Sequence, residues 1–278
     1  MAVCIANNGT ALTRADIYYN DNGTIKSISD MEVWVQNGNN VYKFPQKDHC
    51  ILNLDHTSFS TNILDGASTY LTNNFELWQY ATRYNNLGDI INTDPNSAHG
   101  FKVNNVDKYW WVNDMGNVNL YFGSGSNFFA NQTFTITMTV KFEREPAAWH
   151  NLWWFPDNDK FRMEWNGTSH RLELYGENGF INGEMYFNIS IDDLQRQFVT
   201  LSVVVNGRNV TGYQNGQQVF QGTISRNFSS GIEKIYICGF RAGDQSFGSG
   251  VYISNFAMWK AALTEQELND YYKCAYVL

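Results

Sequence analysis

The sequence predicts an all-β protein, and three observations carry this prediction. Short runs rich in β-branched and aromatic residues recur roughly every 8–12 residues from about residue 100 onward. Turn residues, Asn-Gly above all, separate these runs, and Asn-Gly tolerates the positive φ angles of tight hairpins. The sequence shows no helical crossovers between the runs, which excludes βαβ units. An antiparallel sandwich or barrel follows from this pattern.

Residues 1–48 are predicted to form a small region of β-hairpins. Turns at Asn22-Gly23 and Asn37-Gly38 each separate two strand-like runs. Two hairpins alone bury little apolar surface, so we expect this region to dock on a neighbour or on the rest of the chain. The aromatic residues proposed for this attachment are Tyr18, Tyr19, Trp34 and Tyr42.

The rest of the chain is predicted to divide into a connecting segment, 49–100, and a sandwich, 101–278. The connecting segment is rich in turn residues and can include the first strands of the sandwich. Within it, the periodicity of residues 75–84 leaves a strand and a short helix equally open.

The clearest strand of the sandwich is predicted at 133–142. In TFTITMTVKF every second residue from Phe134 to Phe142 is apolar and Thr residues alternate with them, which is typical of one buried and one polar face. Further strands are expected at 118–122, 152–155, 161–165, 171–175, 197–205, 209–213, 218–220, 234–239 and 251–259. A final helix is expected where Thr264 and Glu267 form a capping box beside the apolar pair Leu263 and Leu268.

Composition narrows the classes of partner. The net charge is −8, and only 17% of the residues are charged. An acidic chain lacks the basic face that nucleic acid or an anionic membrane requires, and no apolar run reaches the roughly 18 residues of a membrane-spanning helix. A polar surface with little charge suits hydrogen bonding to sugars or packing into an assembly.

Three segments resemble concanavalin A-like (laminin-G-type) domains. FTITMTVKF is similar to their early strand, and FVTLSVVVNGRNVTGYQNGQQV is similar to their central hairpin. GVYISNFAMWKAALTEQELNDYY is similar to their closing segment, a strand followed by a capped helix. The order and spacing match over about residues 105–273. The resemblance implies a concanavalin A-like two-sheet jelly-roll sandwich with a lectin-like role.

The N-terminal hairpins are similar in rhythm to short repeats at the starts of phage tail, baseplate and capsid-associated proteins. The start MAVCIANNGTALTRADIYY lacks the apolar stretch of a Sec signal peptide, so we expect synthesis in the host bacterial cytoplasm. The resemblance implies a virion or phage-tail-like particle protein: a capsid decoration, tail fibre or adhesin component. Its expected partners are other particle proteins, copies of itself and host or environmental glycans. A bacterial glycan-binding module and a glycoside hydrolase of the same fold are the alternatives.

Carbohydrate binding needs an exposed aromatic platform with polar groups beside it. One dense cluster offers both, and its members are Trp149, Asn151, Trp153, Trp154, Asp157 and Asn158. Tyr109, Trp110 and Trp111 form a second cluster. Adjacent rings on a strand point to opposite faces, so part of each cluster is core. Full packing in the core and a contact between subunits remain alternatives.

No enzyme and no cofactor are expected. Glycosidases of this fold carry two carboxylates on one strand, and the Glu-x-Asp pattern that places them is missing. Glu143 and Glu145 come nearest, but Pro146 breaks the strand. Asp157, Asp159 and Glu164 could gather, but a solvated loop also explains them. Calcium is common in the superfamily, yet the candidate ligands match no established loop; they are Asp157, Asn158, Asp159 and Asp244.

Overall fold

The structure, a computed structural model, describes most of the chain from residue 129 onward and shorter pieces before it. The described ranges are 6–7, 10–11, 18–21, 24–27, 34–37, 40–43, 45–46, 49–54, 100–104, 107–114, 118–121, 129, 131–146, 149–155, 160–229, 234–238 and 247–275.

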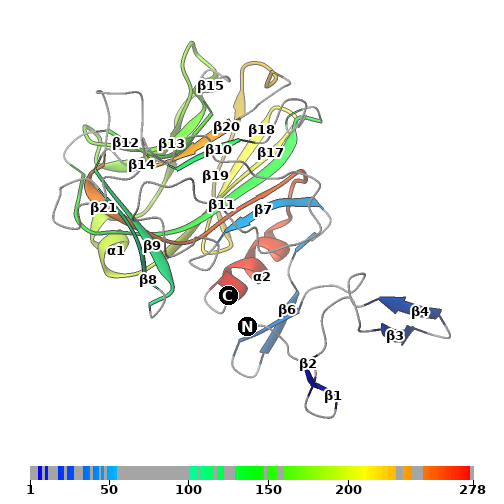
Figure 1. Ribbon diagram of the computed structural model, residues 1–278. Coiled ribbons are helices and arrows are strands. Elements are labelled where there is room, and N and C mark those ends of the chain that lie inside the picture. Colours follow the sequence, from blue (N-terminus) through cyan, green and yellow to red (C-terminus); the bar gives the residue numbers. More distant parts are fainter. Residues whose placement is uncertain are drawn as a thin grey trace.

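Two antiparallel sheets pack face to face (Figure 1), which confirms the predicted sandwich. The six-stranded sheet has the order β10 (Val118–Tyr121), β20 (Lys234–Ile237), β12 (His150–Trp154), β13 (Arg162–Asn166), β14 (Arg171–Tyr175) and β16 (Met185–Phe187). The nine-stranded sheet has the order β15 (Ile181–Asn182), β19 (Gln217–Ile224), β18 (Asn209–Gln214), β17 (Val199–Asn206), β11 (Thr133–Phe142), β21 (Phe247–Trp259), β9 (Tyr109–Asp114) and β8 (Gly100–Asn104). Its ninth strand, β7 (Cys50–Leu54), also pairs with β21.

The predicted strands appear with small shifts at their ends, and β11 and β14 match to the residue. Several elements were not predicted. Strands β15 and β16 are two and three residues long, too short to show a period. Helix α1 (Ile191–Arg196) spans six residues and is capped by Ser190, whose Oγ accepts a hydrogen bond from the Asp193 N–H at 3.1 Å. This cap was the readable signal for α1.

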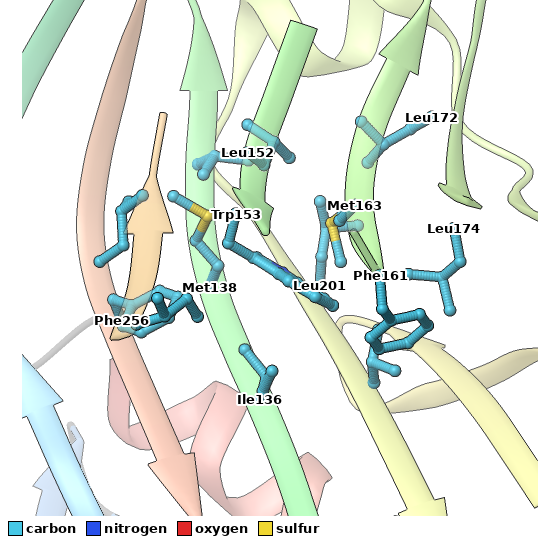
Figure 2. Close-up of a cluster of buried hydrophobic side chains, with 14 of the residues drawn as sticks. Ile136, Met138, Leu152, Trp153, Phe161, Met163, Leu172, Leu174, Leu201 and Phe256 are labelled. Carbon is cyan, nitrogen blue, oxygen red and sulfur yellow. The ribbon is translucent and has the colours of Figure 1, made fainter. Parts of the chain in front are cut away.

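The core lies between the sheets. On β11, the side chains of Ile136 and Met138 face inward and are fully buried. Figure 2 shows Trp153 from β12 among apolar side chains of both sheets, close to Met138 and Leu201 of the nine-stranded sheet. The aromatic residues noted in the sequence therefore supply much of the packing.

The Thr face of β11 is polar, as predicted, but it is buried as well. Thr135, Thr137 and Thr139 are all fully buried. The Thr137 hydroxyl donates to the Ser202 Oγ at 3.0 Å, and the Thr139 and Thr200 hydroxyls lie 2.9 Å apart. Hydroxyl pairs across neighbouring strands thus allow this polar face to be buried.

Helix α2 (Glu265–Ala275) covers part of the same face, as Figure 1 shows. Its capping box is confirmed, because the Thr264 N–H donates to Glu267 at 2.8 Å and the Glu267 N–H donates to the Thr264 Oγ at 3.3 Å. Tyr271 packs edge-on against Trp259 of β21, with ring centres 5.1 Å apart. None of the helices in the described ranges is long and apolar enough to cross a membrane.

Both predicted N-terminal hairpins are present. They pair β3 (Tyr18–Asp21) with β4 (Thr24–Ser27), and β5 (Trp34–Asn37) with β6 (Asn40–Lys43). A further short pair joins β1 (Ala6–Asn7) to β2 (Thr10–Ala11). Strands β5 and β6 lie against α2. The attachment residues Tyr18, Tyr19, Trp34 and Tyr42 lie in these strands, but their side chains are outside the described part, so their role and the domain boundaries stay predictions.

Candidate functional site

The six-stranded sheet turns one face to the core and the other away from the partner sheet; we call the second its outer face. The cross-strand row His150, Trp165, Leu172 and Phe187 is buried in the interior. Neighbouring residues on a strand point to opposite sides, so the adjacent row lies on the outer face. This row contains Asn151, Glu164, Glu173 and Tyr186.

A second row follows on the same face, two residues further along the strands. It contains Tyr236, Trp154, Arg162 and Tyr175. The Trp154 and Tyr236 rings stack with their centres 4.6 Å apart and 17° between their planes. The outer face is therefore built from aromatic rings alternating with charged side chains.

Exposed aromatic residues concentrate on this face. Within the described residues, the large apolar side chains that stand out to solvent are Trp149 (41%), Tyr175 (42%), Tyr186 (42%) and Val219 (37%). The three rings all belong to the outer face, whereas Val219 lies on β19 of the other sheet. Trp149 precedes the inward His150, and its indole N–H donates to the Asn166 Oδ1 of β13 at 3.0 Å.

Two arginines hold the exposed tyrosines in place. The Arg162 guanidinium lies 4.3 Å from the centre of the Tyr175 ring, and that of Arg171 lies 4.5 Å from the Tyr186 ring. Contacts of this length are cation–π interactions, which orient both partners. One side of each ring is thus covered by a guanidinium group, while much of the ring remains open to solvent.

Carboxylates fix the arginines in turn. The Arg162 Nε donates to the Glu164 Oε2 at 2.6 Å, and the Arg171 Nε donates to the Glu173 Oε2 at 2.9 Å. The Arg171 Nη1 also donates to the Glu184 Oε2 at 3.0 Å. Charge-assisted bonds of this kind are short and directional, so the surface is preorganised.

Burial perturbs the inner part of this network. Burial raises the pKa of Glu164, Arg162 lowers it by attraction and hydrogen bonding, and the neighbouring Glu173 raises it; the net shift is upward. Asn151, the cross-strand partner of Glu164, is fully buried. Neither amide atom of Asn151 has a hydrogen-bond partner in the described part of the chain.

The predicted carbohydrate-binding residues divide between the two sides of the sheet. Trp149, Asn151 and Trp154 lie on the outer face, although Asn151 and Trp154 are buried there. Trp153 is fully buried in the core against Phe155 and Phe161, so it provides no surface contact. Asp157 and Asn158 lie outside the described residues.

The second aromatic cluster of the sequence, Tyr109, Trp110 and Trp111, offers less surface to a ligand. Trp110 is fully buried in the core, and the Tyr109 ring packs against Tyr252 at 5.0 Å. The side chain of Trp111 is outside the described part.

The sequence interpretation missed Arg162, Tyr175 and Tyr186 as parts of the face. A readable signal was present, because RMEWN and RLELY each place Arg and Glu two residues apart and hence on one side of a strand. Neither segment alone predicts that these two strands pair, and it is this pairing that brings the charges together.

The groups on this face can stack against a ligand and form hydrogen bonds with it. Glu164 and Glu173 are adjacent across two strands, but each accepts a hydrogen bond from an arginine. Among the described residues, no group of three or more His, Cys, Asp or Glu side chains is placed to hold a metal ion.

Comparison with solved structures shows the same fold in larger proteins. The Trypanosoma rangeli sialidase in complex with sialic acid is 14% identical with a TM-score of 0.59, over 88% of this chain and 36% of that one. The binding domain of botulinum neurotoxin DC in complex with rat synaptotagmin II is 11% identical with a TM-score of 0.58, over 82% and 52%. The same neurotoxin domain in complex with SialylT is 12% identical with a TM-score of 0.55, over 82% and 52%. This chain thus spans about half or less of these chains.

Comparison with protein families gives a match over more than half of the chain. Residues 114–269 match the family described as the concanavalin A-like lectin/glucanases superfamily. The match includes all six strands of the sheet that bears the outer face. A search of curated proteins gave no match. The sandwich, its strand order and the family match together establish that the chain belongs to the concanavalin A-like lectin/glucanases superfamily.

Proposed function

We propose that this chain is a non-enzymatic glycan-binding module whose binding surface is the outer face of the six-stranded sheet. The observation that carries the proposal is the gathering of Trp149, Tyr175 and Tyr186 on one face beside charged hydrogen-bonding groups. A pyranose ring stacks its C–H side on an aromatic ring while its hydroxyls bond to neighbouring polar groups. Rings that arginines already hold in place lose little conformational entropy when a ligand binds, which favours binding at this surface.

Two of the three similar structures support this proposal through their ligands, whereas the third is a complex with a protein, synaptotagmin II. One is a sialidase in complex with sialic acid, and one is a toxin binding domain in complex with SialylT. These ligands belong to those proteins. For this chain they favour the sugar class of ligand over nucleic acid, in line with its net charge of −8.

A non-enzymatic role is supported by the state of the two carboxylates. A glycosidase needs one carboxyl group as acid and a second as nucleophile or base. Here Glu164 and Glu173 are 2% and 7% exposed and each is engaged by an arginine, which leaves neither facing a ligand freely.

A glycoside hydrolase is the second candidate, favoured by the raised pKa of Glu164, a property of acid catalysts. Incubation with β-glucans and measurement of reducing sugar decides between them. Release of sugar that is lost in Glu164→Gln, with the fold retained, would establish the hydrolase.

The binding proposal is tested on a glycan array. We expect specific hits that fall at least tenfold in Tyr186→Ala and in Trp149→Ala. Val219→Ala is the matched control, because Val219 is similarly exposed on the other sheet, and it should bind as the wild type does. A folded wild-type protein without hits on a broad array overturns the proposal.

We further propose that the module belongs to a phage virion or phage-tail-like particle, as a decoration, fibre or adhesin component. The support is the pair of N-terminal hairpins, which follow the rhythm of particle-protein repeats, and the packing of β5 and β6 near α2 on the side away from the outer face. Mass spectrometry of purified particles tests it. Absence of the chain from particles would leave a bacterial glycan-binding module.

A further inference from the structure

We infer that the outer face selects uncharged oligosaccharides and disfavours glycans that carry a carboxylate, such as those ending in sialic or uronic acid. This inference rests on the proposed function and names the ligand class. It sets this chain apart from the sialidase in complex with sialic acid and the toxin domain in complex with SialylT.

The charge balance of the face is the first argument. In the network of arginine–glutamate ion pairs on this face, Glu164, Glu173 and Glu184 contribute a formal −3 and Arg162 and Arg171 contribute +2, which leaves −1 for that network. The chain as a whole carries −8. A carboxylate on a ligand therefore approaches a surface of its own sign.

The arrangement of the arginines is the second argument. An arginine recognises a carboxylate through two parallel N–H···O bonds from its planar fork. The Nε and Nη1 of Arg171 already donate to Glu173 and Glu184. The Nε of Arg162 donates to Glu164, and its Nη1 donates to the Lys160 carbonyl oxygen at 3.3 Å. A carboxylate of an acidic sugar would therefore compete with acceptors of the protein for the N–H groups of Arg162 and Arg171.

A neutral sugar meets groups that suit it. Its hydroxyls can donate to Glu184, whose side chain is 68% exposed, and its C–H face can stack on the open side of Tyr186 next to it. Hydroxyl donation to a carboxylate is a charge-assisted bond and needs no free cation in the protein. The same surface that repels an acid thus binds an alcohol.

The spread of the aromatic rings indicates a ligand longer than one sugar. Trp149 stands at the start of β12, and Tyr186 lies on β16, with β13 and β14 between them. Three strand spacings amount to about 14 Å across the sheet. A single pyranose cannot contact both rings, whereas an oligosaccharide laid across the strands can.

Matched pairs of glycans test the inference. The probes are neutral oligosaccharides printed with and without a terminal sialic or glucuronic acid, lacto-N-neotetraose and its sialylated form among them. We expect the acidic member of a pair to bind at least tenfold more weakly at low salt. Raising the NaCl concentration should bring the affinities for the neutral and the acidic member closer together, because salt screens the repulsion.

Charge variants separate this mechanism from simple steric exclusion. Glu184→Gln removes one negative charge at the face. It should reduce the ratio of neutral-glycan affinity to acidic-glycan affinity two- to fivefold. Glu265→Gln on α2, equally a surface glutamate but on the side of the other sheet, should leave it unchanged. Equal or tighter binding of acidic members overturns the inference alone. Failure of both members of every pair overturns the proposed function and the inference with it.

Discussion

The two sheets of this sandwich treat their outward polar faces in opposite ways. On the nine-stranded sheet, Thr137 and Ser202 pair their hydroxyls and are buried, and α2 covers part of that face. On the six-stranded sheet, Arg162 and Arg171 pair with carboxylates while Tyr175 and Tyr186 remain exposed. In the sequence, the strands of both sheets show the same pattern, in which polar residues alternate with apolar ones.

The difference teaches where to seek function. Neutral hydroxyls that satisfy one another can be buried at little cost, so the first face serves the architecture. Charges and exposed rings contribute little to the stability of a monomer, so their gathering on the second face fits the proposed binding role. Stability and binding should therefore separate when the two faces are mutated.

The largest effect is expected on the covered face. Trp259→Ala removes a fully buried ring that packs on Tyr271 and whose indole N–H donates to the Pro45 carbonyl at 3.0 Å. We expect a loss of about 3–5 kcal/mol in the free energy of unfolding, measured by urea denaturation. Tyr186→Ala on the other face should cost less than about 1 kcal/mol. A similar loss in both variants would contradict the division of roles.

Acid should weaken the six-stranded sheet through His150, which lies in β12 and faces the core. Burial lowers the pKa of His150 from 6.5 to about 4. Between these values the unfolded chain binds a proton that the folded chain does not, so stability falls as the pH falls from 6.5 towards 4. The loss is at most about 3 kcal/mol.

Glu164 acts in the opposite direction, since its raised pKa contributes stability that is lost as the pH rises above 4.5. Urea midpoints of His150→Phe and wild type between pH 4 and 7 test the histidine term. The variant should show a shallower decline in acid. His170→Gln is the control, because His170 is exposed, and an unchanged slope in His150→Phe would contradict the assignment.

The hydroxyl ladder predicts a coupled pair of smaller effects. Thr137→Val alone leaves the Ser202 hydroxyl buried without its partner and should cost about 1–2 kcal/mol. The double variant Thr137→Val with Ser202→Ala should recover part of that loss, because both ends of the bond are removed. Urea denaturation of Thr137→Val, Ser202→Ala and the double variant completes the double-mutant cycle. Strict additivity would show that the pair does not stabilise this face.

The sequence predicted the fold well because its strands are locally encoded. Alternation in β11 and the capping box of α2 depend on residues a few positions apart. The turn at Asn215-Gly216 is encoded in the same local way, since this Asn-Gly pair adopts φ angles of 51° and 80°. Burial of the Thr face was missed, because it depends on what covers the sheet and not on the strand itself.

The candidate site was predicted only in part, for the same reason. A run of aromatic residues indicated Trp149 and Trp154, but strand alternation alone could not tell which ring faces outward. Trp153 is in the core because a register shift between Asn151 and Trp153 resets the alternation in β12. Tyr175 and Tyr186 come from other strands, and only the pairing of β13, β14 and β16 brings them beside Arg162 and Arg171.

The smallest effect on the free energy of unfolding is expected at Asn151, which shares one feature with each of the two faces. Asn151 sits on the outer face like the charged residues, yet it is buried like the hydroxyls and its amide lacks a partner in the described residues. Asn151→Leu keeps the number and branching of the side-chain heavy atoms and removes an unsatisfied polar group, so the free energy of unfolding should stay within about 1 kcal/mol of wild type or rise. Asn151→Asp is the contrasting variant, because a carboxylate buried next to Glu164 should destabilise the protein clearly. A loss above about 2 kcal/mol in Asn151→Leu would show instead that the amide makes a bond essential to the sheet.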